Sequence, residues 1–248
     1  MTNRPVAAIT GASSGIGTEI ATRLAADGYD LALCARRQQR LAQLADVLSA
    51  QHGVEVLTKA VDLRDEPQIL DWFGAISTRF NRFDVLVNNA GLGHQETLAG
   101  GSTEKWRETL DVNEIALCIC TREAIRLMRA RGDDQGHIVH ISSMSGHRVP
   151  GSGMYSASKF AVRALTEGLR QELRAANSAI RISSISPGFV ETEFAEKYSG
   201  SLEQAQQVYS QFPVLQPKDI GNAVGYVLEQ PDYVQVHDVL LRPTQQVS

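Results

Sequence analysis

The chain has 248 residues, of which 43% are hydrophobic and 21% charged, and its formal net charge is -4. This composition suits one globular α/β domain with a large core. Lysines and arginines form no run longer than a pair, so we expect neither a nucleic-acid partner nor a membrane partner. The first plausible strand begins near Pro5, and no stretch of about 18 consecutive apolar residues follows it. We therefore expect a soluble, cytoplasmic protein.

The cysteines and histidines follow no pattern typical of a disulfide framework or a metal site. Cys118 and Cys120 stand two positions apart in a helical stretch and would face away from each other. We expect both, with Cys34, to be buried as small hydrophobic residues. His137 and His140 stand three apart in a strand-like run, so they project from opposite faces of the sheet. No metal ion is expected.

A glycine-rich turn follows the first predicted strand, residues 5–10. Beyond the turn, Ile16, Ile20 and Leu24 recur at helical spacing. A turn of this kind lets the backbone approach a diphosphate, whose charge is attracted by free N–H groups at the start of the helix. A plain tight turn is the alternative, but the position between strand and helix favours a cofactor site. The residues expected to form it are Gly11, Ser13, Ser14, Gly15, Ile16 and Gly17.

The second predicted strand, residues 31–35, ends where dinucleotide-binding folds usually carry an acidic residue for the ribose of NAD. This chain has Arg36 and Arg37 there. Two guanidinium groups suit a 2′-phosphate, which they can hold through paired hydrogen bonds, so NADP is the predicted cofactor. The alternative is that one arginine is merely a solvated residue at the start of a helix.

Two more predicted strands end in groups that could contact the same cofactor. Residues 54–61 are followed by Asp62 and Leu63, and Asp62 could accept a hydrogen bond from adenine or cap the next helix. Residues 83–87 are followed by Asn88, Asn89, Ala90 and Gly91. Their amides could pin neighbouring loops together, while the small residues let a cofactor lie close.

Strands and helices continue to alternate through the second half. We predict helices at 104–129 and 153–176, and strands at 137–141 and 180–185. The polar or glycine-containing segments that end the strands fall at the carboxyl edge of the sheet, where ligands bind in such folds. The predicted fold is α/β, a Rossmann-like doubly wound parallel sheet of about seven strands with helices on both faces. Residues 1–248 should form a single domain.

Tyr155 and Lys159 are four residues apart in a predicted helix and share one of its faces. Free tyrosine titrates near pH ~10. Unit charges ~4 Å apart interact by about 4 kcal/mol at an effective dielectric near 20, equivalent to about three pKa units. The pair therefore predicts a phenol that can act as a general acid or base near neutral pH. An ordinary core tyrosine beside a solvated lysine is the alternative.

Taken together, these motifs resemble the short-chain dehydrogenase/reductase family over nearly the whole chain. They are TGASSGIG at 10–17, NNAG at 88–91, Asn113, ISS at 141–143, Tyr155-x-x-x-Lys159 and Pro187-Gly188. Further segments resemble a subgroup that reduces keto-steroids with NADPH, and insect farnesol dehydrogenases are similar. These segments are NNAGL at 88–92, ICTREA at 119–124, SMSGHRV at 143–149, LTEGLRQELR at 165–174 and RPTQQV at 242–247.

The resemblance implies roles for individual residues. Tyr155 would donate the proton to the substrate oxygen, and Lys159 would lower the pKa of Tyr155 and hold the nicotinamide ribose. Asn113 would hold a water that links Lys159 to solvent. A serine would orient the carbonyl: the usual spacing selects Ser142, whereas alignment on the strand selects Ser143, which we choose. Further cofactor contacts are expected from Pro187, Gly188, Val190 and Thr192.

The substrate is expected to enter beside the segment 189–217, between the Met144–Met154 loop and the turn at 92–94. The aromatic side chains of this segment could form an apolar lid over a ketone, or equally the core side of short helices. They are Phe189, Phe194, Tyr198, Tyr209 and Phe212.

The predicted function is NADPH-dependent reduction of a carbonyl, on a bulky apolar ketone or aldehyde, to an alcohol. A dinucleotide sensor and a redox-neutral enzyme on the same fold are the alternatives. The helices at 104–129 and 153–176 resemble the pair through which the family forms dimers and tetramers, so a homo-oligomer is expected.

Overall fold

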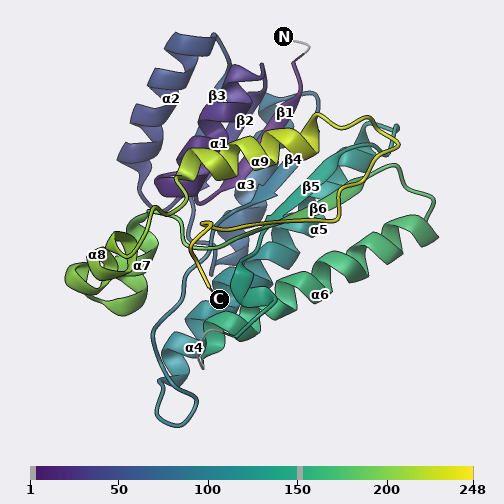
Figure 1. Ribbon diagram of the computed structural model, residues 1–248. Coiled ribbons are helices and arrows are strands. Elements are labelled where there is room, and N and C mark those ends of the chain that lie inside the picture. The colour runs from purple at the N-terminus through teal and green to yellow at the C-terminus, as the bar shows by residue number, and fades with distance from the viewer. Residues whose placement is uncertain (1–3, 150–152, 248) are drawn as a thin grey trace.

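A seven-stranded parallel sheet forms the centre of the computed structural model, which describes residues 4–149 and 153–247 (Figure 1). Its strand order is β3-β2-β1-β4-β5-β6-β7. The strands are β1 Val6–Thr10, β2 Asp30–Ala35, β3 Val56–Ala60, β4 Val85–Asn88, β5 His137–Ile141, β6 Arg181–Pro187 and β7 Asp238–Leu241. The chain builds β1 to β3 towards one edge and then crosses back to place β4 against β1. The predicted doubly wound parallel sheet is confirmed.

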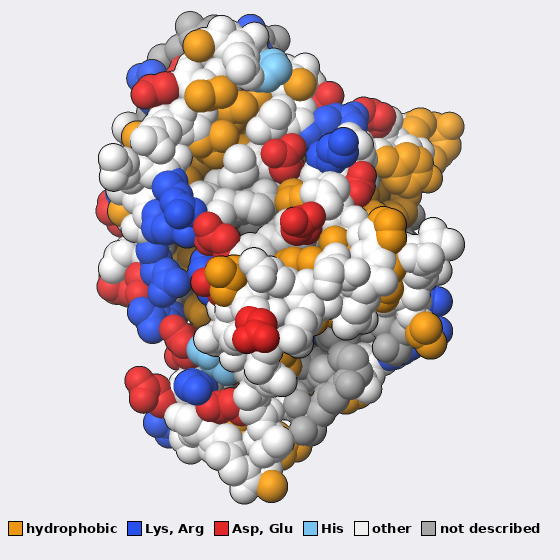
Figure 2. All heavy atoms as spheres, turned by 60° about the vertical axis from the view of Figure 1, so that its left-hand side comes forward, with side chains coloured by type: hydrophobic (Ala, Val, Ile, Leu, Met, Phe, Trp, Pro, Cys, Tyr) orange, Lys and Arg blue, Asp and Glu red, His pale blue; other side chains and the backbone are white. Residues whose placement is uncertain are grey.

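Helices cover both faces of this sheet (Figure 1). One face is covered by α1 Gly15–Ala26, α2 Gln38–His52 and α9 Pro217–Leu228, and the other by α3 Glu66–Arg79, α5 Ala116–Ala130 and α6 Met154–Ala175. The shorter helices α4 Thr103–Leu110, α7 Glu193–Ser199 and α8 Leu202–Ser210 lie beyond the carboxyl ends of the strands. Figure 2 brings the side with α2, α7 and α8 forward and shows Lys and Arg side chains gathered there beside carboxylates.

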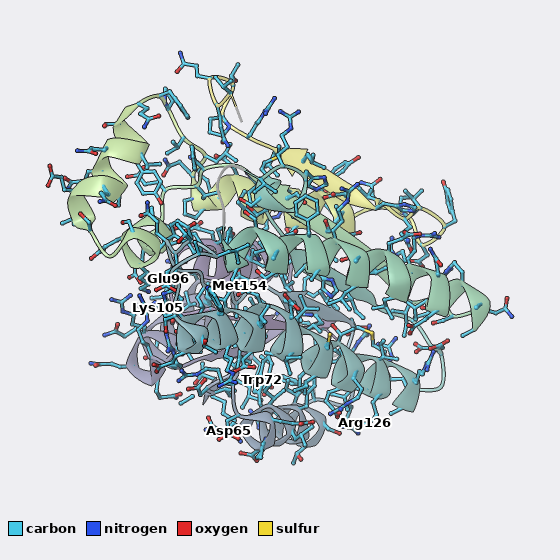
Figure 3. All side chains as sticks on the ribbon, turned by 90° about the horizontal axis from the view of Figure 1, so that it is seen from below. Asp65, Trp72, Glu96, Lys105, Arg126 and Met154 are labelled. Carbon is cyan, nitrogen blue, oxygen red and sulfur yellow. The ribbon has the colours of Figure 1, made fainter. Side chains whose placement is uncertain are left out.

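Alternation along the strands divides the apolar residues between two cores. In β1, Ala7 and Ile9 pack under α1, whereas Val6 and Ala8 face α3 and α5, as the two-residue period of a strand requires. The second core contains the aromatic cluster, in which Trp72 lies between α3 and α5 (Figure 3). Its ring meets that of Phe73 edge-on, with centroids 5.1 Å apart.

The helix predicted at 104–129 is interrupted. Between α4 and α5, residues Asp111–Ile115 form a π-helical turn that carries Asn113. Such turns insert one extra residue into a helix and shift the side chains that follow. The spacing of apolar residues in the sequence does not reveal this shift. The orientation of Asn113 relative to α5 therefore could not be predicted from that spacing.

The other expectations differ from the structure in detail. Strand ends shift by one or two residues, and β7 was not located in the sequence. Cys34 and Cys120 are buried as expected, but Cys118 is exposed on α5, so its predicted burial is wrong. Among the described residues, no helix has the length and apolarity needed to cross a membrane.

Two glycines inside helices provide a test of the packing. Gly74 in α3 is exposed, and a Cβ there would meet nothing within 4 Å. We predict that Gly74→Ala raises the free energy of unfolding by about 1 kcal/mol, because alanine restricts the unfolded chain and favours the helix. In α9, a Cβ on Gly221 would lie 3.0 Å from the Glu19 carbonyl oxygen of α1.

Gly221→Ala should therefore lower the free energy of unfolding, since α1 and α9 would have to move apart. Urea denaturation of both variants measures the two effects. A stabilised Gly221→Ala protein would show that the contact between α1 and α9 is looser than the structure describes.

Candidate functional site

The glycine-rich turn between β1 and α1 has no room for side chains at its key positions. Gly11 and Gly15 have positive φ angles of 68° and 55°, which favour glycine. A Cβ on Gly17 would collide with the Gly11 carbonyl oxygen, and one on Gly11 would lie 2.9 Å from the Cα of Ala90. The turn therefore presents bare backbone at the start of α1, as a diphosphate requires.

The segment after β4 holds this turn in place. The Asn89 side-chain amide donates to the carbonyl oxygens of Thr10 at 2.9 Å and Gly11 at 3.3 Å. The Thr10 hydroxyl accepts from the backbone N–H groups of Asn89 and Ala90, both at 3.0 Å. These contacts join the ends of β1 and β4, as the sequence suggested for the amides at this strand end.

Arg37 extends from the end of β2 across the glycine-rich turn. Its guanidinium donates to the hydroxyls of Ser13 at 3.1 Å and Ser14 at 2.5 Å, and to the carboxylate of Glu193 at 2.8 Å. Arg36 is exposed beside it. A guanidinium fixed at this edge is suited to a phosphate group.

Asp62, predicted to contact adenine or to cap a helix, pairs with Arg64. Its carboxylate accepts from the Arg64 guanidinium at 3.0 and 2.5 Å, and these hydrogen bonds lower the pKa of Asp62 to about 2. The N-cap position of α3 belongs to Asp65, not Asp62, so the capping alternative is wrong. Leu63 packs against the second core.

Tyr155 and Lys159 lie in the first turns of α6, with the Lys159 ammonium 5.7 Å from the centre of the Tyr155 ring. The ammonium donates to the Ile141 carbonyl oxygen at 3.0 Å. Burial raises the pKa of Tyr155 to about 12 and lowers that of Lys159 to about 8. The pKa of the phenol is thus raised rather than lowered as expected from the pair, because burial in the protein disfavours its charged form.

The two candidate serines at the end of β5 differ in environment. The Ser143 hydroxyl hydrogen-bonds with the Tyr155 side chain, and this bond opposes the rise in the pKa of Tyr155. Ser143 also accepts from the backbone N–H of Ser145 at 3.1 Å. The Ser142 hydroxyl is buried without a hydrogen-bond partner among the described residues. The geometry favours Ser143 as the serine that faces the reacting groups.

Asn113 fixes the turn that covers Tyr155. Its side-chain oxygen accepts from the Leu92 N–H at 2.9 Å, and its amide donates to the Leu92 carbonyl at 2.8 Å and to the Ser158 hydroxyl at 2.9 Å. Gly93 follows, and a Cβ there would lie 2.7 Å from the Tyr155 ring. The Asn113 side chain is thus engaged in positioning this turn, and its proposed link to a water stays a prediction.

The segment after β6 closes over the glycine-rich turn from the other side. A Cβ on Gly15 would lie 3.0 Å from the Thr192 methyl group. Gln246 accepts from the Phe189 N–H at 2.9 Å and packs directly on Gly188. Sequence reasoning missed Gln246, because a single glutamine near the C-terminus carries no periodic signal.

An apolar cavity of about 370 Å³ lies between this segment and the Tyr155–Ser143 pair. The Tyr155 ring packs against those of Phe194 and Tyr198, with centroids 5.1 and 5.9 Å apart. Helix α7, which carries both aromatics, has no fully buried residue. This favours the lid interpretation over that of a helix core. Of the loop 144–154, residues 150–152 lie outside the described part of the chain.

Comparison with known proteins identifies relatives along the whole chain. The family model described as short chain dehydrogenase matches residues 5–202. Dehydrogenase/reductase SDR family member 11 of Bos taurus is 46% identical, covering 98% of this chain and 97% of that protein. Farnesol dehydrogenase of Aedes aegypti is 40% identical, covering 96% and 95%. The family and subgroup resemblances seen in the sequence are confirmed.

Solved structures agree with this placement. The closed form of serine dehydrogenase complexed with NADP+ superposes with a TM-score of 0.90 at 31% identity, covering 98% of this chain and 96% of that one.

The environments of the serines predict different effects of their removal. Ser143→Ala should lower the turnover number for a carbonyl substrate by about 10²-fold or more, because a polar group that faces the reacting oxygen is lost. Ser142→Ala, which removes a hydroxyl without a protein partner, should change turnover by less than about threefold. Steady-state kinetics of both variants measures this ranking, and the reverse ranking would assign the role to Ser142.

Proposed function

Because the chain is an oxidoreductase of the short-chain dehydrogenase/reductase family, we propose that it uses NADPH to reduce the carbonyl of a bulky apolar ketone or aldehyde to an alcohol. The observation that carries the proposal is the position of Tyr155. Its side chain, paired with Ser143 and one helical turn from Lys159, stands on the wall of an apolar cavity. A proton donor in such a place can serve a carbonyl oxygen.

The residues at the carboxyl edge of the sheet fit a dinucleotide. The bare backbone from Gly11 to Gly17 suits the diphosphate, and Gly91 lies beside Lys159, where a Cβ would be in van der Waals contact with the ammonium at 3.5 Å. Arg36 and Arg37 stand where an acidic residue would favour NAD, so we propose NADP(H). When bound, the nicotinamide supplies the hydride, while the protein supplies geometry and protons.

Each of four residues of the chain would then have its own role in the reaction. Tyr155, protonated at neutral pH, donates its proton to the substrate oxygen as that oxygen gains charge. Ser143 donates a hydrogen bond to the same oxygen and so stabilises the charge. Lys159 has three N–H donors and gives one to Ile141, which leaves donors for ribose hydroxyls. Asn113 keeps the turn at Leu92 and Gly93 packed over the phenol.

The lining of the cavity supports an apolar substrate. Met144, Phe194, Tyr198 and Val208 contribute apolar surface beside Tyr155. The relative from Aedes aegypti is named for farnesol, an apolar alcohol. We therefore propose that the segment 189–217 acts as a lid on a bulky apolar group.

A homo-oligomer is proposed as well. The helices α5 and α6 run side by side (Figure 3) and expose large apolar side chains, among them Leu165 on α6 and, in the turn before α5, Ile115. A second copy of the chain would cover such a surface. Sedimentation of a monomer alone would contradict this part of the proposal.

The decisive test is NADPH oxidation with a panel of 3-keto and 17-keto steroids, farnesal, diketones and small keto acids. We expect turnover with at least one bulky apolar carbonyl. Tyr155→Phe keeps the ring and its aromatic contacts but removes the proton, so it should lower turnover by about 10²- to 10⁴-fold. If NADPH binds and no carbonyl is reduced, the result would favour a dinucleotide sensor or a redox-neutral enzyme instead.

Activity should also depend on the charge of Lys159. Because its pKa is lowered to about 8, the ammonium form predominates below that pH and is lost as the pH rises through it. Tyr155, with a pKa of about 12, stays protonated over the same range. We predict that kcat/KM for NADPH, which reports the free enzyme, is level near neutral pH and falls about tenfold per pH unit well above pH 8.

The profile is measured by initial rates, with circular dichroism at each pH as the control for folding. A level profile up to about pH 10 would contradict a need for the ammonium.

A further inference from the structure

Glu193, the first residue of α7, is surrounded by cations. Its carboxylate pairs with Arg37 at 2.8 Å, Arg40 at 2.6 Å and Lys197 at 2.7 Å. Three positive charges thus face one negative charge, which leaves an excess of two. Hydrogen bonds from these cations hold the pKa of Glu193 far below its usual range, so the carboxylate is ionised at any physiological pH.

The cations come from two different parts of the chain. Arg37 and Arg40 belong to the start of α2 and its flank, next to the glycine-rich turn, whereas Lys197 belongs to α7 itself. Figure 2 shows basic and acidic side chains next to one another on the side of the molecule that carries α2 and α7. The Glu193 and Arg37 side chains are each 35% exposed, so a dissolved anion can reach them.

An arginine that contacts Ser13 and Ser14 has a defined place beside the glycine-rich turn. A 2′-phosphate read by Arg37 would approach the same guanidinium that Glu193 now binds. A phosphate monoester carries up to about two negative charges and three acceptor oxygens, so in place of the carboxylate it would neutralise more of the three positive charges and accept more of their hydrogen bonds. The phosphate and the Glu193 carboxylate cannot both accept hydrogen bonds from the same N–H groups.

We propose that Glu193 is a cofactor-specificity residue, whose carboxylate competes with the 2′-phosphate of NADP(H) for Arg37 and Arg40. This inference rests on the proposed preference for NADP(H). The competition weakens binding of the phosphate and links it to α7, because an anion that takes Arg37 releases the contact between α2 and the lid helix. Glu193 is adjacent to Phe194, whose ring packs on Tyr155, so the exchange occurs one residue from the substrate cavity.

The test compares two ligands that differ only in the 2′-phosphate: adenosine 2′,5′-bisphosphate and adenosine 5′-monophosphate. Their dissociation constants are measured by calorimetry at low ionic strength. We expect Glu193→Gln to tighten binding of the bisphosphate by about 3- to 10-fold and to leave that of the monophosphate unchanged.

Glu196→Gln is the matched control. Glu196 lies on the same helix, is exposed and has no ion pair among the described residues, so this variant removes the same charge without removing the competitor. We expect Glu196→Gln to leave the ratio of the dissociation constants of the bisphosphate and the monophosphate as it is in the unmodified protein. An equal gain in both variants would assign the effect to general charge and overturn the inference.

Other outcomes separate the inference from the proposed function. If the unmodified protein prefers the bisphosphate and Glu193→Gln leaves that preference unchanged or weakens it, Glu193 does not compete and only the inference fails. If neither the unmodified protein nor Glu193→Gln prefers the bisphosphate, the proposed use of NADP(H) fails together with it.

Discussion

The chain leaves β3 at one edge of the sheet and returns to build β4 against β1, so the ends of β1 and β4 come to lie side by side. The glycine-rich part of the candidate site depends on this crossing. The glycine-rich turn follows β1, and Asn89 follows β4 and hydrogen-bonds to that turn. The contact is close enough to exclude a side chain at Gly17. Because the two segments fix each other, the backbone that would face a diphosphate is formed by the fold itself.

Burial, rather than the attraction between neighbouring charges, decides the protonation of Tyr155 and Lys159. An attraction of about 4 kcal/mol between unit charges ~4 Å apart at an effective dielectric near 20 would favour the charged forms, but burial is the largest influence on both pKa values, and the ammonium donates to the Ile141 carbonyl oxygen. Both side chains therefore favour their neutral forms more than in water. A protonated phenol is the form that the proposed reduction of a carbonyl would require, so the raised pKa of Tyr155 is consistent with that proposal.

The sequence predicted those features that depend on local pattern. The period of apolar residues placed six of the seven strands and the helices that became α1, α5 and α6, while the glycines indicated the turn at Gly11–Gly17 and strand ends placed Asn89, Ser143 and Gly188 at one edge. It did not predict the π-helical turn at Asn113, since that turn leaves the apolar spacing almost unchanged. Arg40, Glu193 and Gln246 were also missed, because each gains its role from a contact with a distant segment. Such contacts depend on the packing of α2, α7 and the C-terminal segment, which no local pattern encodes.

Those distant contacts connect the two halves of the candidate site, the glycine-rich turn and the apolar cavity beside Tyr155. Thr192 packs on Gly15 of the glycine-rich turn, and the next residue, Glu193, binds Arg37. Phe194 then packs on Tyr155. Three consecutive residues thus contact the glycine-rich turn, the arginine beside it and Tyr155. A shift of α7 that opens the apolar cavity would therefore disturb the contact with Gly15 or with Arg37, so under the proposed function the shape of the cavity would depend on what binds at the glycine-rich turn.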